Sequence, residues 1–457
     1  MLFCRAPLVL LLGALALLAT SRATLQREDF ANCYSSSALD IVKPYADDIH
    51  GKCMVVLGGD SGLGFAAARA LATSGASVII ASHKAAKGER AAARIDALLS
   101  LVKVVPLDLN SFDSVRAAAS DMERLCGGKV DALLANAGIS WDRGYADVTP
   151  DGFDHIFQVD FLGQALLIEL LLPSLRKAQG RVIHTTGDSN FLPCLADAAP
   201  RKPDGTYDLA STVWNMENYT ACITLQGFAK AATAQAPLSF VRPIHASGER
   251  LIDTPTRIGV FRYGLAKFAQ TLHAFEFAKR EEVNGVHAFS VDPALVITEI
   301  WTCKDDKKVE ELTKDNLEKV AVSKSDHGFV PPKLENPAKF NRTCGGAYDL
   351  GLSDEEYEKV LAHAVERVAK LYGVKPEGMV LADQGAATLA WLAAAPIEGR
   401  LAEANGRHFR HCQPVDSVRD VLVQNGGEAE ASSFVSRLYD LNRAFVLGGP
   451  PWVDRSY

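Results

Sequence analysis

The sequence predicts a doubly wound α/β fold, in which helices cover both faces of a mostly parallel sheet. Two observations favour this fold over residues 52–186: the apolar runs are short and continuous, and helical stretches alternate with them. Continuous apolar strands are typical of a sheet buried on both faces, and right-handed crossovers place helices on each side. A third observation is the glycine-rich turn that follows the first apolar run. We therefore expect one domain over residues 52–445, interrupted by two insertions.

The expected elements follow one another in a regular order. We expect strands over 54–57, 77–81, 104–107, 130–135, 181–185 and 286–291. We expect helices over 65–73, 85–99, 111–125, 153–176, 263–280 and 383–393, with a short segment near 406–409. The insertions, 188–258 and 302–378, follow the fifth and sixth strands, and a surface helix is expected over 354–371 within the second. Both lie at the carboxyl end of the sheet, where they could form a lid over a substrate.

The first 23 residues differ in composition from the rest of the chain. Arg5 precedes an apolar run over 6–19, and the small residues Ser21 and Ala23 follow it. This pattern is typical of a secretory signal peptide, and the run is short for a bilayer span of roughly 20 residues. We expect the endoplasmic reticulum lumen or secretion, with a plastid reached by the secretory route, or an uncleaved membrane anchor, as alternatives. Residues 24–51 form an expected extension, and 446–457 an expected tail.

Charge and cysteine content limit the partners and the compartment. The formal net charge of −7 offers no basic excess to collect phosphates, which excludes nucleic acid as an expected partner. Nine cysteines are present, and loss of Cys4 with the signal would leave an even number. Our hypothesis pairs neighbours in the sequence, and buried free thiols are the alternative. The proposed pairs are Cys194 with Cys222 and Cys303 with Cys344. Separately, two glycosylation sequons begin at Asn218 and Asn341.

The glycine-rich turn predicts a Rossmann-type dinucleotide site. Gly58 permits the turn out of the strand, Gly62 lets the backbone approach a pyrophosphate, and Gly64 lets the helix pack closely on the sheet. Ser61 and Leu63 complete the loop, whose backbone N–H groups lie at the positive end of the following helix. A glycine-rich turn that binds nothing is the alternative.

The end of the second strand predicts the choice of nucleotide. An acidic residue there would bind the ribose 2′-hydroxyl and favour NAD. This sequence instead has Ser82, His83 and Lys84, of which the last two could meet a 2′-phosphate. We therefore expect NADP rather than NAD, although Lys84 could simply be a solvated residue at a helix start.

Tyr263 and Lys267 form the candidate chemical pair. Their four-residue spacing places both side chains on one face of an expected helix. A tyrosine normally keeps its proton until about pH 10, but a neighbouring cation lowers that pKa. The pair could therefore pass a proton to or from an alcohol while a hydride moves on nicotinamide. An ordinary amphipathic helix is the alternative interpretation of the same spacing.

Together with the glycine loop, this pair resembles the short-chain dehydrogenase/reductase family. Further segments look like family landmarks in the right order, namely Asp108-Leu109, Asn136-Ala137-Gly138, and Pro293-Ala294 with Thr298. The first resembles the adenine-flanking segment, the second follows the fourth strand, and the third resembles the segment that closes over nicotinamide. Segments 384–387 and 406–409 are similar to the retinol dehydrogenase and protochlorophyllide reductase-like branch. The resemblance covers about 52–187, 259–300 and 380–445.

The chain departs from the family pattern at two positions. The serine that normally holds the substrate oxygen corresponds to Gly187, so Thr186 or Ser189 would have to supply the hydroxyl. The asparagine that supports a proton path to the lysine corresponds to Asp160, whose charge would change the local pKa balance.

The resemblance implies an NADP-dependent oxidoreductase. It would transfer a hydride between nicotinamide and a carbonyl or alcohol of a bulky apolar small molecule such as a retinoid, a lipid or a tetrapyrrole. Tyr263 would be the acid/base, and Lys267 would lower its pKa and hold the nicotinamide ribose. The departures motivate an alternative, a catalytically impaired NADP-binding scaffold or partner protein. We single out no metal ligands, and a homodimer is left open.

Overall fold

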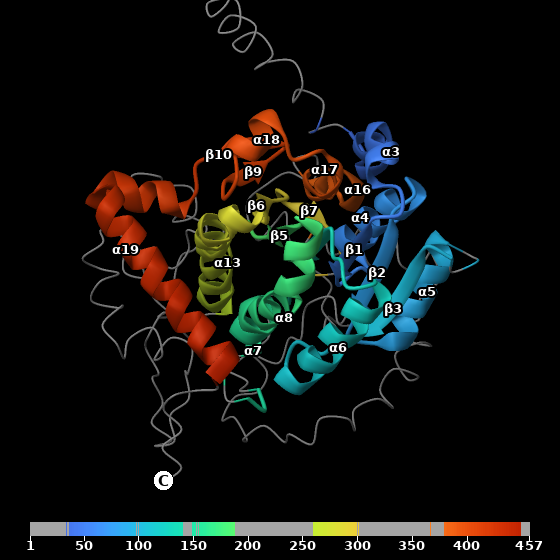
Figure 1. The fold of residues 1–457 in the computed structure, drawn as a ribbon, viewed down its shortest axis with the longest axis horizontal. Helices are drawn as coiled ribbons and strands as arrows, with labels where there is room; N and C mark the ends of the chain where they lie inside the picture. Colours follow the sequence, from blue (N-terminus) through green and yellow to red (C-terminus); the bar gives the residue numbers. More distant parts are fainter. Residues whose placement is uncertain are drawn as a thin grey trace, which may run out of the picture.

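In the computed structural model, an eight-stranded sheet forms the centre of the molecule (Figure 1). The structure describes residues 36–139, 149–187, 259–300 and 379–448, apart from 97, 99, 152, 154 and 299, together with 33 and 366. The strand order is β10-β9-β6-β5-β4-β1-β2-β3, and every neighbouring pair is parallel except β9 and β10. The predicted doubly wound sheet is therefore confirmed.

The strands match the apolar runs closely. Their bounds are β1 Cys53–Leu57, β2 Ser77–Ser82, β3 Val102–Pro106, β4 Ala132–Ala135, β5 Arg181–Thr185, β6 His287–Asp292, β9 His408–Arg410 and β10 Gln413–Val415. The chain leaves the centre in one direction through β2 and β3, then returns to the other side of β1 at β4. This reversal creates a crevice at the carboxyl ends of β1 and β4, which is where open α/β sheets bind ligands.

Helices cover both faces of the sheet. One apolar core packs the sheet against α6 (Phe112–Leu125), α8 (Gly163–Ala178) and α13 (Gly259–Glu281). The other packs it against α4 (Gly62–Thr73), α5 (Ala85–Ile95) and α17 (Ala387–Ala394). Ala38, Val42 and Ile49 of the expected extension are fully buried in this second core. They lie on α2 (Ala38–Val42) and on α3 (Ala46–Ile49), which the short helix η1 (Lys43–Tyr45) joins.

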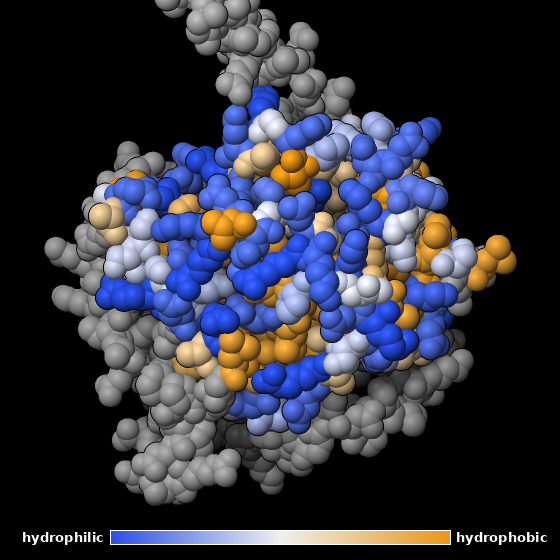
Figure 2. Space-filling view, viewed as in Figure 1, coloured by the Kyte–Doolittle hydropathy of each residue, from blue (hydrophilic) through white to orange (hydrophobic). Residues whose placement is uncertain are grey.

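A long apolar helical segment runs through the first core. It comprises α7 (His155–Phe157), the π-helical turn η2 (Gln158–Leu162) and α8. By length and composition, residues His155–Ala178 could cross a membrane, but 83% of the most apolar window is buried. Its apolarity therefore reflects its place in the core. Large exposed apolar side chains on the described surface are scattered over separate elements, and Figure 2 shows hydrophilic side chains around small apolar patches.

Several elements differ from the prediction. The helix expected over 85–99 ends at Ile95, because the Asp96 carboxylate accepts hydrogen bonds from the backbone N–H groups of Leu98 and Leu101. The helix expected over 383–393 is divided at Ala386 into α16 (Ala382–Gly385) and α17. The hairpin strand β10 and the helix α19 (Val418–Gly448), which changes direction at Gly427, were not predicted.

Two disulfides lie within the described residues. Cys33 is bonded to Cys412, and Cys53 is bonded to Cys126. The pairs proposed from the sequence lie outside the described residues and stay predictions, as do both insertions, their surface helix, both sequons, Ser189 and the signal segment.

Candidate active site

The glycine loop joins the carboxyl end of β1 to the start of α4. Gly62 has a φ of +51°, and a Cβ built there would lie 3.3 Å from Thr298. A Cβ at Gly64 would lie 2.2 Å from the carbonyl oxygen of Gly58, so only glycine fits. The side chain of Ser61 makes no capping hydrogen bond to the first amides of α4. A tight loop with these helix-start amides suits the phosphates of a dinucleotide.

Asn136 ties the loop to the neighbouring strands. Its Nδ2 donates to the carbonyl oxygen of Leu57, and its Oδ1 accepts from the hydroxyl of Thr185. Ala137 lies against Gly58, where a Cβ would approach the alanine Cα to 3.2 Å. The three strand ends β1, β4 and β5 are therefore held together on the floor of the crevice.

Lys267 and Tyr263 lie together on α13, as predicted. The Lys267 ammonium is 5.0 Å from the centre of the Tyr263 ring. Its Nζ donates to the carbonyl oxygen of Thr185 at 3.1 Å and lies 3.4 Å from Oδ2 of Asp160. Burial lowers the pKa of Lys267, and the Asp160 carboxylate opposes that effect. The side chains of Lys267 and Asp160 are only 3% and 0% exposed, so their charges are barely screened by solvent.

The π-helical turn η2 places Asp160 beside the lysine. Oδ1 of Asp160 accepts a 2.8 Å hydrogen bond from the backbone N–H of Ile139, and Oδ2 lies 3.0 Å from where a Cβ of Gly138 would be. Single π turns inside α-helices often occur at functional sites. Here the π turn directs the Asp160 carboxylate toward both Lys267 and the loop that follows β4.

The hydroxyl of Thr186, next to the position where the family has a serine, already makes a hydrogen bond. Thr186 is buried, and its Oγ1 donates to the carbonyl oxygen of Val291 at 3.1 Å. Its backbone N–H donates to the same oxygen. Gly187 carries no side chain, and Ser189 lies outside the described residues. The role expected for Thr186 or Ser189 stays a prediction.

The segment from Asp292 to Thr298 crosses the glycine loop. Ala294 has a φ of +67°, and its backbone N–H donates to Oδ1 of Asp292. The short strand β7 (Val296–Ile297) pairs with β8 (Val380–Leu381), and Val296 packs against Gly385, where a Cβ would lie 2.6 Å away. Because Thr298 contacts Gly62, this segment is held over the site at both ends.

The adenosine side carries the predicted polar groups. Nε2 of His83 lies 3.7 Å from Oδ2 of Asp108. Burial alone would raise the pKa of Asp108, but hydrogen bonds and charge from His83 and hydrogen bonds from Asn110 lower it to about 2. Leu109 is buried against Gly163, and Lys84 begins α5, where its carbonyl oxygen accepts from Ser82.

Sequence reasoning missed two groups of residues at the site. Gln164 donates to the carbonyl oxygen of Ala137 at 2.6 Å and accepts from Gln270. Two buried glutamines in apolar helices were a usable signal, because a buried amide needs partners. Arg410, whose Nη2 lies 3.1 Å from Oδ2 of Asp292, gave no local signal, because it comes from a distant strand.

Comparisons with known proteins find similar oxidoreductases. Residues 52–195 match the family model of the short chain dehydrogenases. Oxidoreductase calI of Penicillium decumbens is 29% identical over 54% of this chain and 60% of its own length. Mouse retinol dehydrogenase 12 is 31% identical over 55% of this chain and 64% of its own. The chain thus spans less than two thirds of these relatives. L-sorbose reductase of Gluconobacter frateurii superposes with a TM-score of 0.44 at 17% identity, covering 79% of this chain and 95% of that one.

The sheet order and the glycine loop are typical of dinucleotide-binding α/β proteins. The motifs that surround the loop, and the sequence matches, narrow this class further. Over residues 52–195 the chain is similar to the short-chain dehydrogenases.

Proposed function

We propose that the protein is an NADP-dependent oxidoreductase that interconverts a carbonyl and an alcohol on an apolar substrate. The observation that carries the proposal is the contact of Tyr263 with Lys267 on α13. Asp160 lies between Lys267 and Gly138, and the adjacent Ala137 lies against Gly58 of the glycine loop. When bound, a nicotinamide cofactor supplies or accepts the hydride. Retinol dehydrogenase 12 and polyprenol dehydrogenase, both from mouse, are relatives whose names suggest long apolar alcohols.

The protein's own residues would manage the proton. Tyr263 would exchange a proton with the substrate oxygen, and the buried cation of Lys267 would favour the ionised phenol in that exchange. Lys267 is fixed by the carbonyl oxygen of Thr185 and by Asp160, so its charge is held in one place. The helix-start amides of α4 would bind the pyrophosphate.

Preference for NADP rests on the end of β2. His83 and Lys84 follow this strand at the place where an NAD-binding protein would have an acidic residue, and Asp108, which follows β3, lies 3.7 Å from His83. We expect Lys84→Glu to weaken NADPH binding by about tenfold or more while NADH binding changes little, because the new charge would repel a 2′-phosphate. Titration of both nucleotides by fluorescence checks this. Equal loss of both affinities would contradict the preference.

The decisive experiment compares Tyr263→Phe with the wild type. We expect the variant to bind nucleotide normally, while turnover on a panel of apolar aldehydes, ketones and alcohols falls by about 10²- to 10⁴-fold. Equal turnover by the two proteins would contradict the assigned role. Absence of nucleotide binding in the wild type would overturn the proposal as a whole.

A second function is favoured by the hydroxyl of Thr186. Because this group donates to Val291 and the usual serine position is Gly187, the substrate oxygen lacks one expected donor among the described residues. A scaffold that binds NADP without turnover would fit this feature. Nucleotide binding without turnover on the panel, and no effect of Tyr263→Phe, would support the scaffold.

We also propose that the protein acts in the secretory pathway. The amino-terminal pattern supports it, and so do the two disulfides, since disulfides persist in oxidising compartments. Localisation of a fusion at the carboxyl end, compared with one lacking residues 1–23, tests this. Plastid import by the same route and an uncleaved anchor are the other outcomes, and a homodimer is tested by light scattering.

A further inference from the structure

A carboxylate under the site-closing segment is held by an arginine from a distant strand. Asp292 ends β6 and Arg410 ends β9, and the two residues are directly opposite in the parallel pairing. The Asp292 side chain is 4% exposed and lies 3.1 Å from Nη2 of Arg410. A buried carboxylate without a cation is strongly disfavoured, so the position of Asp292 depends on this partner.

The same carboxylate supports a strained turn. Its other oxygen accepts a hydrogen bond from the backbone N–H of Ala294, whose φ of +67° is energetically unfavourable for a non-glycine residue. The hydrogen bond to Asp292 offsets that cost. Since the segment continues to Thr298 against Gly62, the turn at Ala294 sets how the segment lies over the glycine loop.

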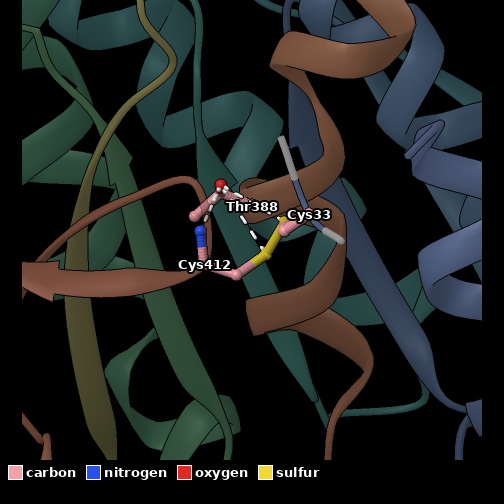
Figure 3. The surroundings of a disulfide bond; sticks show 3 residues. All are labelled: Cys33, Thr388 and Cys412. Atoms are coloured by element: carbon pink, nitrogen blue, oxygen red, sulfur yellow. Dashed lines mark hydrogen bonds between the residues drawn. A yellow bond between two sulfur atoms is a disulfide. The ribbon is translucent and has the colours of Figure 1, made fainter. Parts of the chain in front are cut away.

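The arginine is itself held by a strained hairpin. His411 and Cys412 connect β9 to β10, with φ of +51° and +60°. A two-residue hairpin of this type favours Asn-Gly, so His-Cys needs support from outside the turn. Figure 3 shows that support: Cys412 is bonded to Cys33, and its backbone N–H donates to the hydroxyl of Thr388 on α17 at 3.0 Å.

We propose that Arg410 is a positioning residue for the nucleotide site, and that the Cys33–Cys412 disulfide keeps it in place. The disulfide holds the hairpin, the hairpin holds Arg410, and Arg410 holds Asp292 and the turn over the glycine loop. This proposal rests on the proposed function only in one respect, namely that the tests measure the binding of NADPH. The disulfide therefore has a role in ligand binding in addition to stability.

The first test replaces the arginine. Arg410→Gln removes the charge, and we expect the Kd for NADPH to rise about tenfold, because the turn loses its preorganised position. Arg410→Lys keeps the charge and should recover part of that loss. Arg410→Gln should also lower the melting temperature, because it leaves the buried Asp292 carboxylate without its cation, so the affinities are measured well below that temperature. Unchanged affinity in Arg410→Gln, or an affinity loss that only follows the melting temperature, would overturn the proposal.

The second test compares the two disulfides. Cys33→Ala breaks the bond to Cys412, and we expect the Kd for NADPH to rise several-fold. The matched control is Cys53→Ala with Cys126→Ala, because that bond joins the start of β1 to the end of α6, and the glycine loop follows the other end of β1. The control variant should be less stable than the wild type but bind NADPH with unchanged affinity. Equal affinity losses in both variants would count against a specific role for Cys33–Cys412.

Hydrogen exchange provides a readout that needs no nucleotide. Amides over 292–298 should exchange faster in Arg410→Gln and in Cys33→Ala, while those of β1 stay protected. If the wild type binds neither nucleotide but this response is present, the proposed function fails and the positioning role stands. If the wild type binds and exchange over 292–298 is unchanged, the positioning role fails alone.

Discussion

Asp160 is the residue that most changes the chemistry of the site. It places a carboxylate 3.4 Å from Lys267, where the family pattern has a neutral asparagine. Its charge opposes the effect of burial, which lowers the pKa of Lys267. The lysine cation therefore persists to higher pH than burial alone would allow.

Asp160→Asn should make the lysine lose its charge at lower pH. Without the carboxylate, only desolvation remains, and the pKa of Lys267 falls further. We expect the basic limb of the kcat/KM profile to move down by about one pH unit or more. The control is Asp121→Asn, which removes a carboxylate that is 53% exposed on α6. A basic limb that stays in place would show that Lys267 does not control it.

Ala294 is a residue whose conformation suits glycine better. Its φ of +67° is strained for alanine, so Ala294→Gly should raise the free energy of unfolding by about 0.5–1 kcal/mol. Ala404→Gly is the matched control, because Ala404 has a φ of −92° and should lose about as much through unfolded-state entropy. Urea unfolding of both variants checks the signs. Destabilisation of both would mean that the turn at Ala294 is not strained in solution.

At the scale of elements, α19 covers α13. Leu422 and Val435 of α19 are buried with Phe268 and Leu272 of α13, and Figure 1 shows the long helix lying alongside the domain. Tyr439 donates to Glu169 of α8, which places α19 against both helices of this face. The residues that follow the hairpin therefore complete the core.

Leu422→Ala should show how much α19 contributes. The side chain is fully buried, so its truncation should cost about 2–5 kcal/mol in transfer free energy and cavity formation. Leu447→Ala truncates a leucine on the same helix that is 44% exposed, and should cost less than about 0.5 kcal/mol. Equal effects in denaturant unfolding would mean that α19 does not pack on α13.

At the scale of the whole molecule, buried histidines link stability to pH. His184 and His273 share a 3.1 Å hydrogen bond. Burial lowers the pKa of His273 to about 3, with Arg280 adding to the effect, and burial lowers the pKa of His184 well below its usual value. Below about pH 6.5, both histidines bind a proton in the unfolded chain but stay neutral in the folded chain. The free energy of unfolding therefore falls with acidification.

Replacement of His273 should reduce that acid sensitivity. Between about pH 6.5 and pH 4, the wild type should lose about 1.4 kcal/mol per pH unit for each buried histidine. In His273→Leu, the free energy of unfolding should fall less steeply with acidification, by about that amount per pH unit. This holds whatever the stability of the variant near pH 7. His50→Gln, at an exposed position, should leave the slope unchanged. Urea unfolding at several pH values checks this, and equal slopes in His273→Leu and the wild type would contradict it.

The sequence by itself determined the parallel sheet, the glycine loop, and the Tyr263–Lys267 pair. Each is a local pattern: an apolar run, a strand–turn–helix join, or a four-residue spacing on one helix. Local hydrogen bonding and burial settle such features, so they can be predicted without knowledge of the contacts made by the rest of the chain.

Only the tertiary structure decided which distant groups meet at the site. Arg410 reaches Asp292 because β6 and β9 pair, and Cys412 on the β9–β10 hairpin bonds Cys33 of the amino-terminal segment. No local pattern marks these partners, since their proximity follows from the order of the strands rather than from spacing along the chain. The floor of the site and the charge of Asp160 near Lys267 were therefore predictable, while the support of the closing segment was not.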